Sequence, residues 1–298
     1  MSGAAVALRR AMLKILTVLV LSSTTALAAP APVVGGTTVP KGEWPDAVAV
    51  LADTAACTGT LIAPDVVLTA GHCIETRPKI VVVDSVDFLD QSAGEVIAVT
   101  SATAYPDWQH KYDVGVLVLA HAAKTKPRAI AAACTAKELV ANAKVRVVGF
   151  GLTTQAGTGD NSKLHQADLG VTDPTCALSG CEKTVAPSGE FVAGGHGKDA
   201  CFGDSGGPVY LGDALIGVVS RGMSSNNKPC GDGGIFVRAD TVVGWIEQVT
   251  RRKLVRATCD KADTEDTSDG AGGCAAAGGA GLPIALVGLA LVRRRRRA

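Results

Sequence analysis

The sequence has few aromatic residues and almost no net charge. Aromatic side chains make up 4% of its 298 residues, and the formal net charge is +1. A near-neutral chain lacks the excess positive charge typical of nucleic-acid-binding proteins, so no nucleic-acid partner is expected. The 35 glycines, set against so few aromatics, predict many turns and a core packed from small residues.

Several signatures of other enzyme classes are also missing. The sequence has no zincin motif and no phosphate-binding loop, so neither a metal nor a cofactor is expected, and it has no convincing internal repeat. No histidine follows Ser205, because the five histidines are His72, His110, His121, His165 and His196. That order excludes an α/β-hydrolase reading of Gly-Asp-Ser-Gly-Gly at residues 203–207, since that fold places its histidine after the serine.

The N-terminus has the features of a secretory signal. Arg9, Arg10 and Lys14 form a basic region before apolar residues 15–21. Ala-Leu-Ala at residues 26–28 offers a cleavage site. We expect a signal peptide at residues 1–28, and the alternative is an uncleaved membrane anchor, for which the apolar run is short. Export agrees with the nine cysteines, since disulfides persist in oxidising compartments.

The C-terminus differs in character from the rest of the chain. Residues 256–273 are acidic, lack apolar periodicity and are expected to form a flexible linker. Residues 275–292 carry no charge and are followed by a run of arginines at 293–297. This order predicts a membrane stop with its charges on the cytoplasmic side, although the segment is near the lower length limit for a span. A basic nucleic-acid-binding tail is the alternative, but such a tail would not need the apolar run.

Between the two ends, short strand-like segments are separated by turn residues. Apolar runs or alternations predict strands at residues 44–51, 57–62, 66–69, 79–83, 95–100, 114–119, 145–150, 163–171, 209–211, 214–220 and 234–238. An Ala-rich connector at residues 129–142 divides them into two sets. Helical spacing at residues 240–252 predicts a terminal helix with Val243, Ile246 and Val249 on one side and Asp240 or Thr241 as its cap. The pattern predicts an all-β fold of two antiparallel barrels with a C-terminal helix.

The most informative stretch is residues 198–208, where Ser205 lies among glycines with Asp204 before it. A serine is a weak nucleophile and needs a neighbouring base and a site for the developing anion. Glycines let backbone N–H groups approach a substrate oxygen closely. The alternative is a Gly-rich turn capped by Asp and Ser.

Four motifs occur together in one order. They are Val-Val-Gly-Gly at residues 33–36, Thr-Ala-Gly-His-Cys at 69–73, Asp-Val-Gly-Val-Leu at 113–117 and Gly-Asp-Ser-Gly-Gly-Pro at 203–208. With these motifs the chain resembles the trypsin family of chymotrypsin-like serine proteases over residues 33–252. The resemblance implies two six-stranded barrels and a protease domain at residues 33–255, with protein or peptide substrates.

The resemblance also implies a role for each residue of a catalytic triad. His72 would be the general base, Asp113 would accept the proton-bearing ring nitrogen of His72, and Ser205 would attack the substrate carbonyl. The N–H groups of Gly203 and Ser205 would form the oxyanion hole. The alternatives are a hairpin-end histidine bonded to backbone for His72 and a simple strand-start acid for Asp113.

Substrate selection is implied by the same resemblance. Asp199 matches the floor of the primary specificity pocket, where an acid selects Arg or Lys before the scissile bond, and the alternative is an exposed loop acid. Gly222 and Gly234 match small residues that keep this pocket open, and Ser220 matches a polar residue near the catalytic acid. Arg221 departs from the family, which often has an aromatic residue there. The rim also differs in length, being longer than usual at residues 223–229 and shorter at 230–234.

Activation would follow the family pattern with one departure. The freed ammonium of Val33 would pair with Asp204, so the resemblance implies a zymogen cut after Pro32 rather than after the usual Arg or Lys. Residues 29–32, Ala-Pro-Ala-Pro, would be a short propeptide made of two X-Pro dipeptides. An activating protease is therefore an expected partner, and a dipeptidyl peptidase acting twice would suffice.

Eight cysteines are expected to form disulfides. Cys57–Cys73 and Cys201–Cys230 match family pairs. Cys176 also matches a family position, but its usual partner is replaced by Val192, and Cys181 is the expected substitute. Cys134 and Cys259 are paired by elimination.

Cys274 is left over, and it precedes the apolar and arginine-rich tail. Residues 274–298 resemble a myxobacterial-type C-terminal sorting signal, in which the cysteine is the processing or modification point. The resemblance implies sorting machinery as a partner and a protein initially tethered to the membrane before surface display or release. The alternative is a plain tail anchor with an unpaired thiol.

One acidic region could in principle bind a metal ion. Asp84, Asp87, Asp90 and Glu95 lie in a region that binds Ca²⁺ in some relatives, but a solvated acidic loop is the favoured interpretation.

The expected function is a secreted or surface-directed serine endopeptidase that cleaves after Arg or Lys. A non-catalytic binding protein on the same fold is the rival, followed by a surface structural protein.

Overall fold

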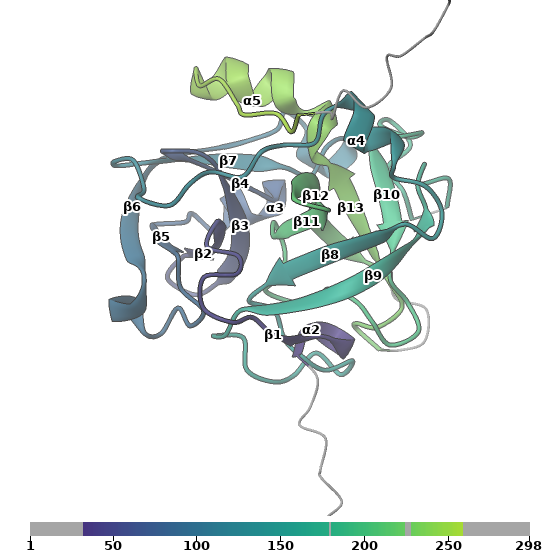
Figure 1. The fold of residues 1–298 in the computed structure, drawn as a ribbon, viewed down its shortest axis with the longest axis horizontal. Helices are drawn as coiled ribbons and strands as arrows, with labels where there is room; N and C mark the ends of the chain where they lie inside the picture. The colour runs from purple at the N-terminus through teal and green to yellow at the C-terminus, as the bar shows by residue number, and fades with distance from the viewer. Residues whose placement is uncertain (1–31, 179, 224–227, 259–298) are drawn as a thin grey trace, which may run out of the picture. The chain divides into compact units, whose positions relative to one another are not determined.

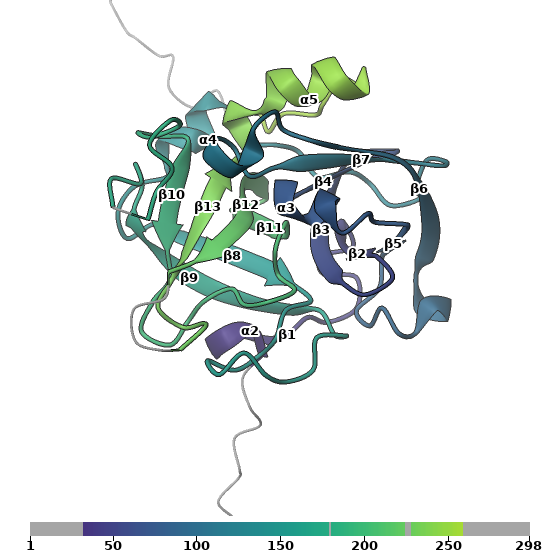
Figure 2. The same ribbon diagram turned by 180° about the vertical axis from the view of Figure 1, so that it is seen from behind.

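Two adjacent antiparallel β-barrels make up the fold (Figure 1; Figure 2 shows it from behind). The computed structural model describes residues 32–258 apart from 179 and 224–227. The predicted fold class, two six-stranded barrels with a C-terminal helix, is confirmed. The signal peptide, most of the propeptide, Cys259, Cys274 and the tail lie outside the described residues.

The first barrel uses the strands that precede the Ala-rich connector. They close in the order β2-β3-β4-β7-β6-β5. Their bounds are β2 (Ala47–Leu51), β3 (Ala56–Ala63), β4 (Val66–Thr69), β5 (Ile80–Val83), β6 (Glu95–Ala104) and β7 (Gly115–Leu119). Buried aliphatic side chains such as Val48, Leu61, Val67 and Leu117 fill its interior.

The second barrel closes because β8 pairs with both β11 and β9. Its strands are β8 (Lys144–Gly149), β9 (His165–Asp173), β10 (Glu190–Ala193), β11 (Pro208–Leu211), β12 (Ala214–Gly222) and β13 (Gly234–Arg238), and the short β1 (Thr37–Thr38) adds to β9. The sequence patterns did not predict β1 or β10. All four residues of β10, including Glu190, are buried, so it has no period-2 alternation to reveal it.

Helical segments are short. They comprise α2 (Pro32–Gly35), α3 (Gly71–Glu75), α4 (Ala133–Lys137), α5 (Val243–Thr250) and single turns at Gln91–Ala93, Trp108–His110 and Ala239–Thr241. The connector therefore contains a helix, α4. Among the described residues, no helix is both long and apolar enough to cross a membrane.

The C-terminal helix begins later than the sequence predicts. Asp240 and Thr241 were the expected caps, but Asp240 accepts two hydrogen bonds from Arg238 and the Thr241 hydroxyl donates to the Arg238 carbonyl. Neither side chain is free to cap, and α5 starts at Val243. Ile246 is buried as expected, whereas Val249 is exposed.

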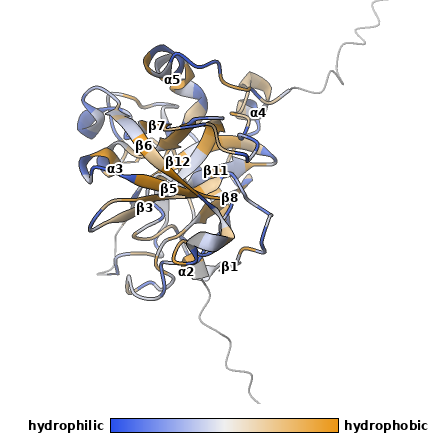
Figure 3. Ribbon diagram, turned by 90° about the vertical axis from the view of Figure 1, so that its left-hand side faces the viewer, coloured by the Kyte–Doolittle hydropathy of each residue, from blue (hydrophilic) through white to orange (hydrophobic). Residues whose placement is uncertain are grey.

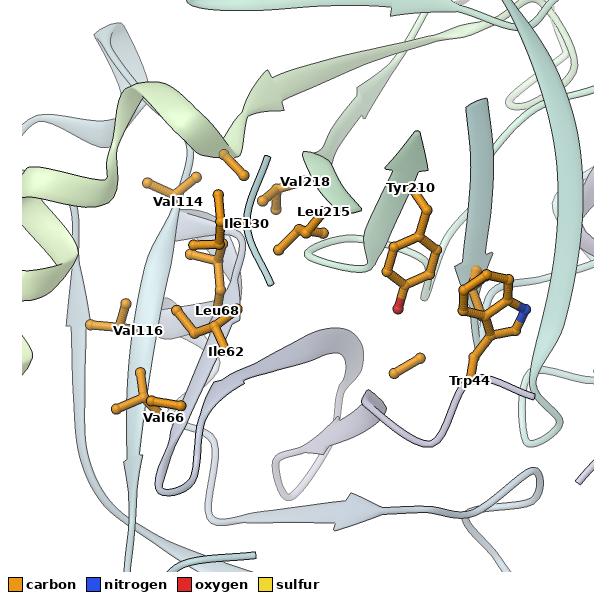
Figure 4. Close-up of a cluster of buried hydrophobic side chains, with 14 of the residues drawn as sticks. Trp44, Ile62, Val66, Leu68, Val114, Val116, Ile130, Tyr210, Leu215 and Val218 are labelled. Atoms are coloured by element: carbon orange, nitrogen blue, oxygen red, sulfur yellow. The ribbon is translucent and has the colours of Figure 1, made fainter. Parts of the chain in front are cut away.

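The two barrels share a core. Figure 4 shows Ile62, Leu68 and Val114 of the first barrel facing Ile130, Leu215 and Val218 of the second half. The indole ring of Trp44 stacks on Tyr210, with ring centroids 4.4 Å apart. Apolar residues concentrate on the strands and polar ones on the loops in Figure 3. This shared core fixes the barrels against each other, and so fixes the two sides of the cleft described next.

Candidate active site

His72 and Asp113 are brought together by the pairing of β4 with β7. Thr69 at the end of β4 is opposite Gly115 at the start of β7, so the residues just beyond these two ends are neighbours. His72 Nδ1 lies 2.9 Å from Asp113 Oδ2, and the His72 backbone N–H donates to Asp113 Oδ1 over 2.9 Å. Gly71 is required here, because a Cβ at this position would lie 2.8 Å from the Trp108 side chain.

The Asp113 carboxylate is nearly buried but well hydrogen-bonded. Its Oδ2 also accepts a hydrogen bond of 2.8 Å from the Ser220 hydroxyl. Burial opposes ionisation, yet the hydrogen bonds and charge of His72 together with the Ser220 bond keep the pKa of Asp113 below its usual value. Asp113 is therefore an anion at neutral pH, as a partner for an imidazolium must be.

Ser205 lies in a loop held between the two barrels. Its carbonyl accepts the Thr58 N–H over 2.9 Å, and the Thr58 hydroxyl donates to the Gly203 carbonyl over 2.7 Å. Gly206 adopts φ +80°, and a Cβ there would lie 2.0 Å from the Thr69 hydroxyl. Only glycine fits at this close approach, so the motif's glycine is what lets the loop settle against the first barrel.

Two backbone N–H groups near the Ser205 side chain make no hydrogen bond with the described residues. Within the part of the chain that the structure describes, neither the Gly203 N–H nor the Ser205 N–H donates a hydrogen bond. Gly203 has φ +100°, which favours glycine. Unpaired N–H groups next to a serine are what stabilisation of an oxyanion requires.

Five of the predicted site residues meet at one cavity of about 410 Å³, whereas Asp199, Gly203 and Gly234 do not line it. His72, Asp113, Ser205, Ser220 and Gly222 all line it. The remaining lining residues are Trp108, Ala200, Cys201, Phe202, Val219, Arg221 and Cys230. Sequence reasoning missed Trp108 and Phe202 as cleft residues, because a single aromatic in a loop carries no pattern that separates a cleft from any other surface.

Asp199 is fully buried directly before the cavity-lining residues Ala200 and Cys201. Its Oδ2 accepts the N–H groups of Gly231 and Gly233, whereas its Oδ1 has no hydrogen-bond partner among the described residues. Burial raises the pKa of Asp199 to about 6, against the effect of its backbone hydrogen bonds. The exposed-loop alternative for Asp199 is thus wrong, and the carboxylate retains the capacity to accept a cation.

The two predicted pocket glycines differ in the space around them: Gly222 borders open space, and Gly234 is tightly packed. At Gly222 the nearest atom to an added Cβ is 3.7 Å away, so the position opens into the cavity. At Gly234 an added Cβ would lie 3.2 Å from Asp199 Oδ1 and would cover it. Glycine at residue 234 therefore avoids a close contact with the buried, unpaired oxygen of Asp199.

Asp204 points away from the cavity into the second barrel. Its carboxylate accepts the N–H groups of Gly151 and Cys201 over 2.7 and 2.8 Å. A Cβ at Gly149 or Gly151 would lie 2.2 Å from a carboxylate oxygen of Asp204, so both glycines make room for it. Complete burial raises the pKa of Asp204 to about 7.

The Val33 segment packs close to the Asp199 loop. Val33 is fully buried among apolar residues of the second barrel, and the Val34 carbonyl accepts the Asp199 N–H over 3.1 Å. Gly35 adopts φ +80° and passes so near Gly197 that a Cβ would lie 2.8 Å from its carbonyl oxygen.

Three disulfides match the predicted pairs, namely Cys57–Cys73, Cys176–Cys181 and Cys201–Cys230. The first ends on the residue after His72, and the third joins two cavity-lining residues. Cys134 is also disulfide-bonded. Its predicted partner Cys259 lies outside the described residues.

Arg221, which departs from the family pattern, lies beside the cavity with Glu190 as its partner. Arg221 Nη1 and Nη2 lie 2.7 and 2.9 Å from the two carboxylate oxygens of Glu190, which is fully buried. Sequence reasoning did not single out Glu190. An acid heading an otherwise apolar run was the signal that could have found it, because a buried acid needs a partner.

The acidic residues near β6 each bind a different partner and do not converge on one point. Asp87 pairs with Lys163 over 2.6 Å, Asp90 accepts from Ser92, and Glu95 accepts the Lys124 N–H. Among the described residues, the only groupings with metal-ligand spacing are Cys57 with His72 and Cys73, and Cys176 with Cys181 and Glu190. Both contain disulfide-bonded cysteines, which cannot act as thiolate ligands.

Comparison with known proteins agrees with this geometry. The trypsin family profile matches residues 33–246. A trypsin of Saccharopolyspora erythraea is 34% identical over 61% of this chain and 81% of its own length. Glucanase inhibitor protein 1 of Phytophthora sojae is 31% identical over 74% of this chain and 89% of its own.

Two further similarities extend the comparison. Chymotrypsin-like elastase family member 1 of Bos taurus is 31% identical over 72% of this chain and 88% of its own length. The solved structure of neuropsin, a serine protease of mouse brain, superposes with a TM-score of 0.62 at 24% identity, covering 72% of this chain and 98% of neuropsin. Because the family profile matches most of the chain and the relatives align over most of their own length, the chain belongs to the trypsin family.

Proposed function

We propose that the protein is a serine endopeptidase that cleaves peptide bonds after Arg or Lys through His72, Asp113 and Ser205. The observation that carries this proposal is the convergence of His72 and Ser205 on one cavity, with His72 already oriented by Asp113. The unused N–H groups of Gly203 and Ser205 support it further.

The chemistry follows from the roles of these groups. His72 Nδ1 bears the proton shared with Asp113, so Nε2 is the basic nitrogen and takes the Ser205 proton as the hydroxyl oxygen attacks the carbonyl carbon. The oxyanion of the tetrahedral intermediate accepts from Gly203 and Ser205. His72 then protonates the leaving amine, and water hydrolyses the acyl-serine by the same steps.

Specificity for a basic residue is proposed from Asp199. Its Oδ1 is buried without a hydrogen-bond partner among the described residues, which is unfavourable unless a cation arrives. A substrate Arg or Lys would supply that charge, with open space at Gly222 and no side chain at Gly234 to crowd Asp199.

Activation is proposed to need a cut between Pro32 and Val33. The new ammonium of Val33 would neutralise Asp204, whose buried carboxylate is paired only with N–H donors among the residues that the structure describes. Proline before the cut makes self-activation by an Arg/Lys-specific enzyme unsuitable, so another protease is required. N-terminal sequencing of active enzyme tests this, and a start other than Val33 would refute it.

We further propose that the protein is exported, which agrees with its disulfides. Residues 1–28 would direct export, and residues 274–298 would tether the protein to the membrane until sorting machinery processes Cys274. Fractionation of cells expressing the Cys274→Ser variant tests the tail, because loss of processing would leave the protein in the membrane fraction.

A non-catalytic binding protein is the second candidate. It is favoured by the similarity to a protein named as a glucanase inhibitor. The presence of His72, Asp113 and Ser205 around one cavity favours the protease instead.

The deciding experiment uses processed protein with a verified Val33 terminus. Peptides that differ only in the residue before the scissile bond are offered to it and to Ser205→Ala. Rapid cleavage after Arg and Lys, abolished in Ser205→Ala, is expected. Cleavage after other residues would remove the Asp199 assignment, and no cleavage by folded protein would favour the binding-protein candidate.

A further inference from the structure

The pair of Arg221 and Glu190 is fixed rigidly beside the cleft. Glu190 is fully buried on β10, and Arg221 on β12 meets both its oxygens in a bidentate pair. The Glu190 carboxylate also accepts the Glu182 N–H over 2.8 Å, and Arg221 Nη2 also donates to the Gly180 carbonyl over 2.9 Å. A planar guanidinium held by these contacts has little freedom to rotate.

One nitrogen of this guanidinium contacts Ser220, the residue that is hydrogen-bonded to Asp113. Arg221 Nη1 lies 3.1 Å from the Ser220 hydroxyl oxygen, which lies 2.8 Å from Asp113 Oδ2. A guanidinium can only donate hydrogen bonds, so Ser220 must accept from Arg221 with a lone pair. The one hydroxyl proton of Ser220 is then directed to Asp113.

A backbone irregularity makes this contact possible. Consecutive side chains on a regular strand point to opposite faces, which would separate Ser220 from Arg221. The pairing of β12 with β13 shifts register between Val219 and Arg221, as at a β-bulge. Bulges re-aim side chains, and here the long Arg221 side chain turns back toward its neighbour.

We infer that Arg221 is a positioning residue, which, anchored on buried Glu190, holds the Ser220 hydroxyl on Asp113 and thereby steadies His72. The inference rests on the proposed protease function. It assigns a function to the charged residue that replaces the family's frequent aromatic. The rival role is a direct contact with extended substrates, because Arg221 is partly exposed and lines the cavity.

The test removes the guanidinium without leaving a buried unpaired acid. In Arg221→Met combined with Glu190→Gln, both charges disappear with little change in volume. Processed enzyme and this double variant are assayed on a minimal ester of a single acylated arginine and on a long peptide with the same arginine. We expect kcat to fall about fivefold on both substrates with KM nearly unchanged.

The same double change is then made in a Ser220→Ala background. If Arg221 acts through Ser220, its removal there lowers kcat less than about twofold, because the two effects are not additive. Equal losses in both backgrounds, a loss confined to the long peptide, or no loss would each overturn the inference while leaving the protease function standing. An inactive parent enzyme would instead overturn the proposed function and this inference with it.

A second variant guards against misfolding of the first. Arg221→Lys retains the charge on Glu190, but a single ammonium cannot replace both the bidentate fork and the Ser220 contact. We expect a smaller loss of kcat, again equal on the minimal ester and the long peptide. A loss seen only with the long peptide would again overturn the inference.

Discussion

His72 is attached to Asp113 twice, once through its ring and once through its backbone. The Nδ1–Oδ2 and N–Oδ1 distances are both 2.9 Å. The backbone bond fixes where the carboxylate lies, and the ring bond then fixes which nitrogen bears the proton. Both contacts therefore act on the tautomer that general-base catalysis needs.

Replacing Asp113 with Asn is expected to lower kcat about 10⁴-fold, with little change in fold. The amide can donate to the His72 ring nitrogen where the carboxylate could only accept, which favours the wrong tautomer. Steady-state kinetics with an arginine peptide measures the effect, alongside thermal unfolding of both proteins.

The matched control is Asp107→Asn. Asp107 also lies 2.9 Å from a histidine Nδ1, that of His110, but this pair is on the exposed surface. Asp107 has φ +57°, a conformation that Asn also tolerates. Its variant should retain full activity. Equal losses in the two variants would contradict the role given to Asp113.

Asp199→Ser is expected to remove the preference for basic residues. Loss of one partner of a buried charge pair lowers kcat/KM for Arg and Lys substrates by about 10²- to 10³-fold. Cleavage after uncharged residues should not fall. Competition between two peptides that differ at one residue measures the ratio directly.

Asp53→Ser is the control for Asp199, because Asp53 is an exposed acid paired with Lys79. Its specificity ratio should match that of the parent. A parent-like ratio in Asp199→Ser would mean that another group selects the substrate.

The extent of sequence-based prediction differs between local and long-range features. Short apolar runs bounded by turns predicted most strands, because each run must bury its own side chains wherever it lies. β10 was missed because it has no period-2 alternation and begins with the acid Glu190, whose charged partner Arg221 lies 31 residues away. No local pattern reveals such a partner.

The candidate site divides in the same way. Motifs with fixed residue types predicted His72, Asp113 and Ser205 as a catalytic set, and the structure brings the three side chains to one cavity. Their catalytic roles stay a proposal. The link from Arg221 through Ser220 to Asp113 depends on a register shift in β12 and could not be read from the chain. The α5 start was misjudged because the expected caps Asp240 and Thr241 both bind Arg238 instead.

Processing at Val33 is expected to change how stability depends on pH. In the uncut chain, burial raises the pKa of Asp204 to about 7 from an ordinary value of 3.8. The unfolded chain thus loses this proton near pH 4 and the folded one near pH 7, so stability is lost as pH rises between them. A free Val33 ammonium would stabilise the carboxylate and weaken this loss.

Thermal unfolding of cut and uncut protein between pH 4 and pH 8 measures the effect. The Tm of the uncut form should fall more steeply with pH than that of the cut form. Apart from the new Val33 ammonium, Asp199 and the other titrating groups are present in both forms, so their contributions largely cancel in the comparison. In an Asp204→Asn background the two curves should become parallel, and a steeper fall in the cut form would contradict the pairing.

His165 is expected to destabilise the protein in acid. Its ring is buried, and its Nδ1 has no hydrogen-bond partner among the described residues. Burial lowers the pKa of His165 to about 4, opposed by nearby Asp160 and assisted by Lys163. The unfolded chain binds a proton near pH 6.5 and the folded one only near pH 4, so stability is lost as pH falls between these values.

His165→Leu should therefore lose less Tm than the parent protein between pH 6.5 and pH 4, with little change at pH 7. The substitution replaces the titrating ring with an apolar side chain at the buried first residue of β9. Asp199 and Asp204 titrate equally in both proteins. His121→Leu, which alters an exposed histidine, should follow the parent curve. If His165→Leu also ran parallel to the parent, the proton uptake that limits acid stability would have to occur elsewhere.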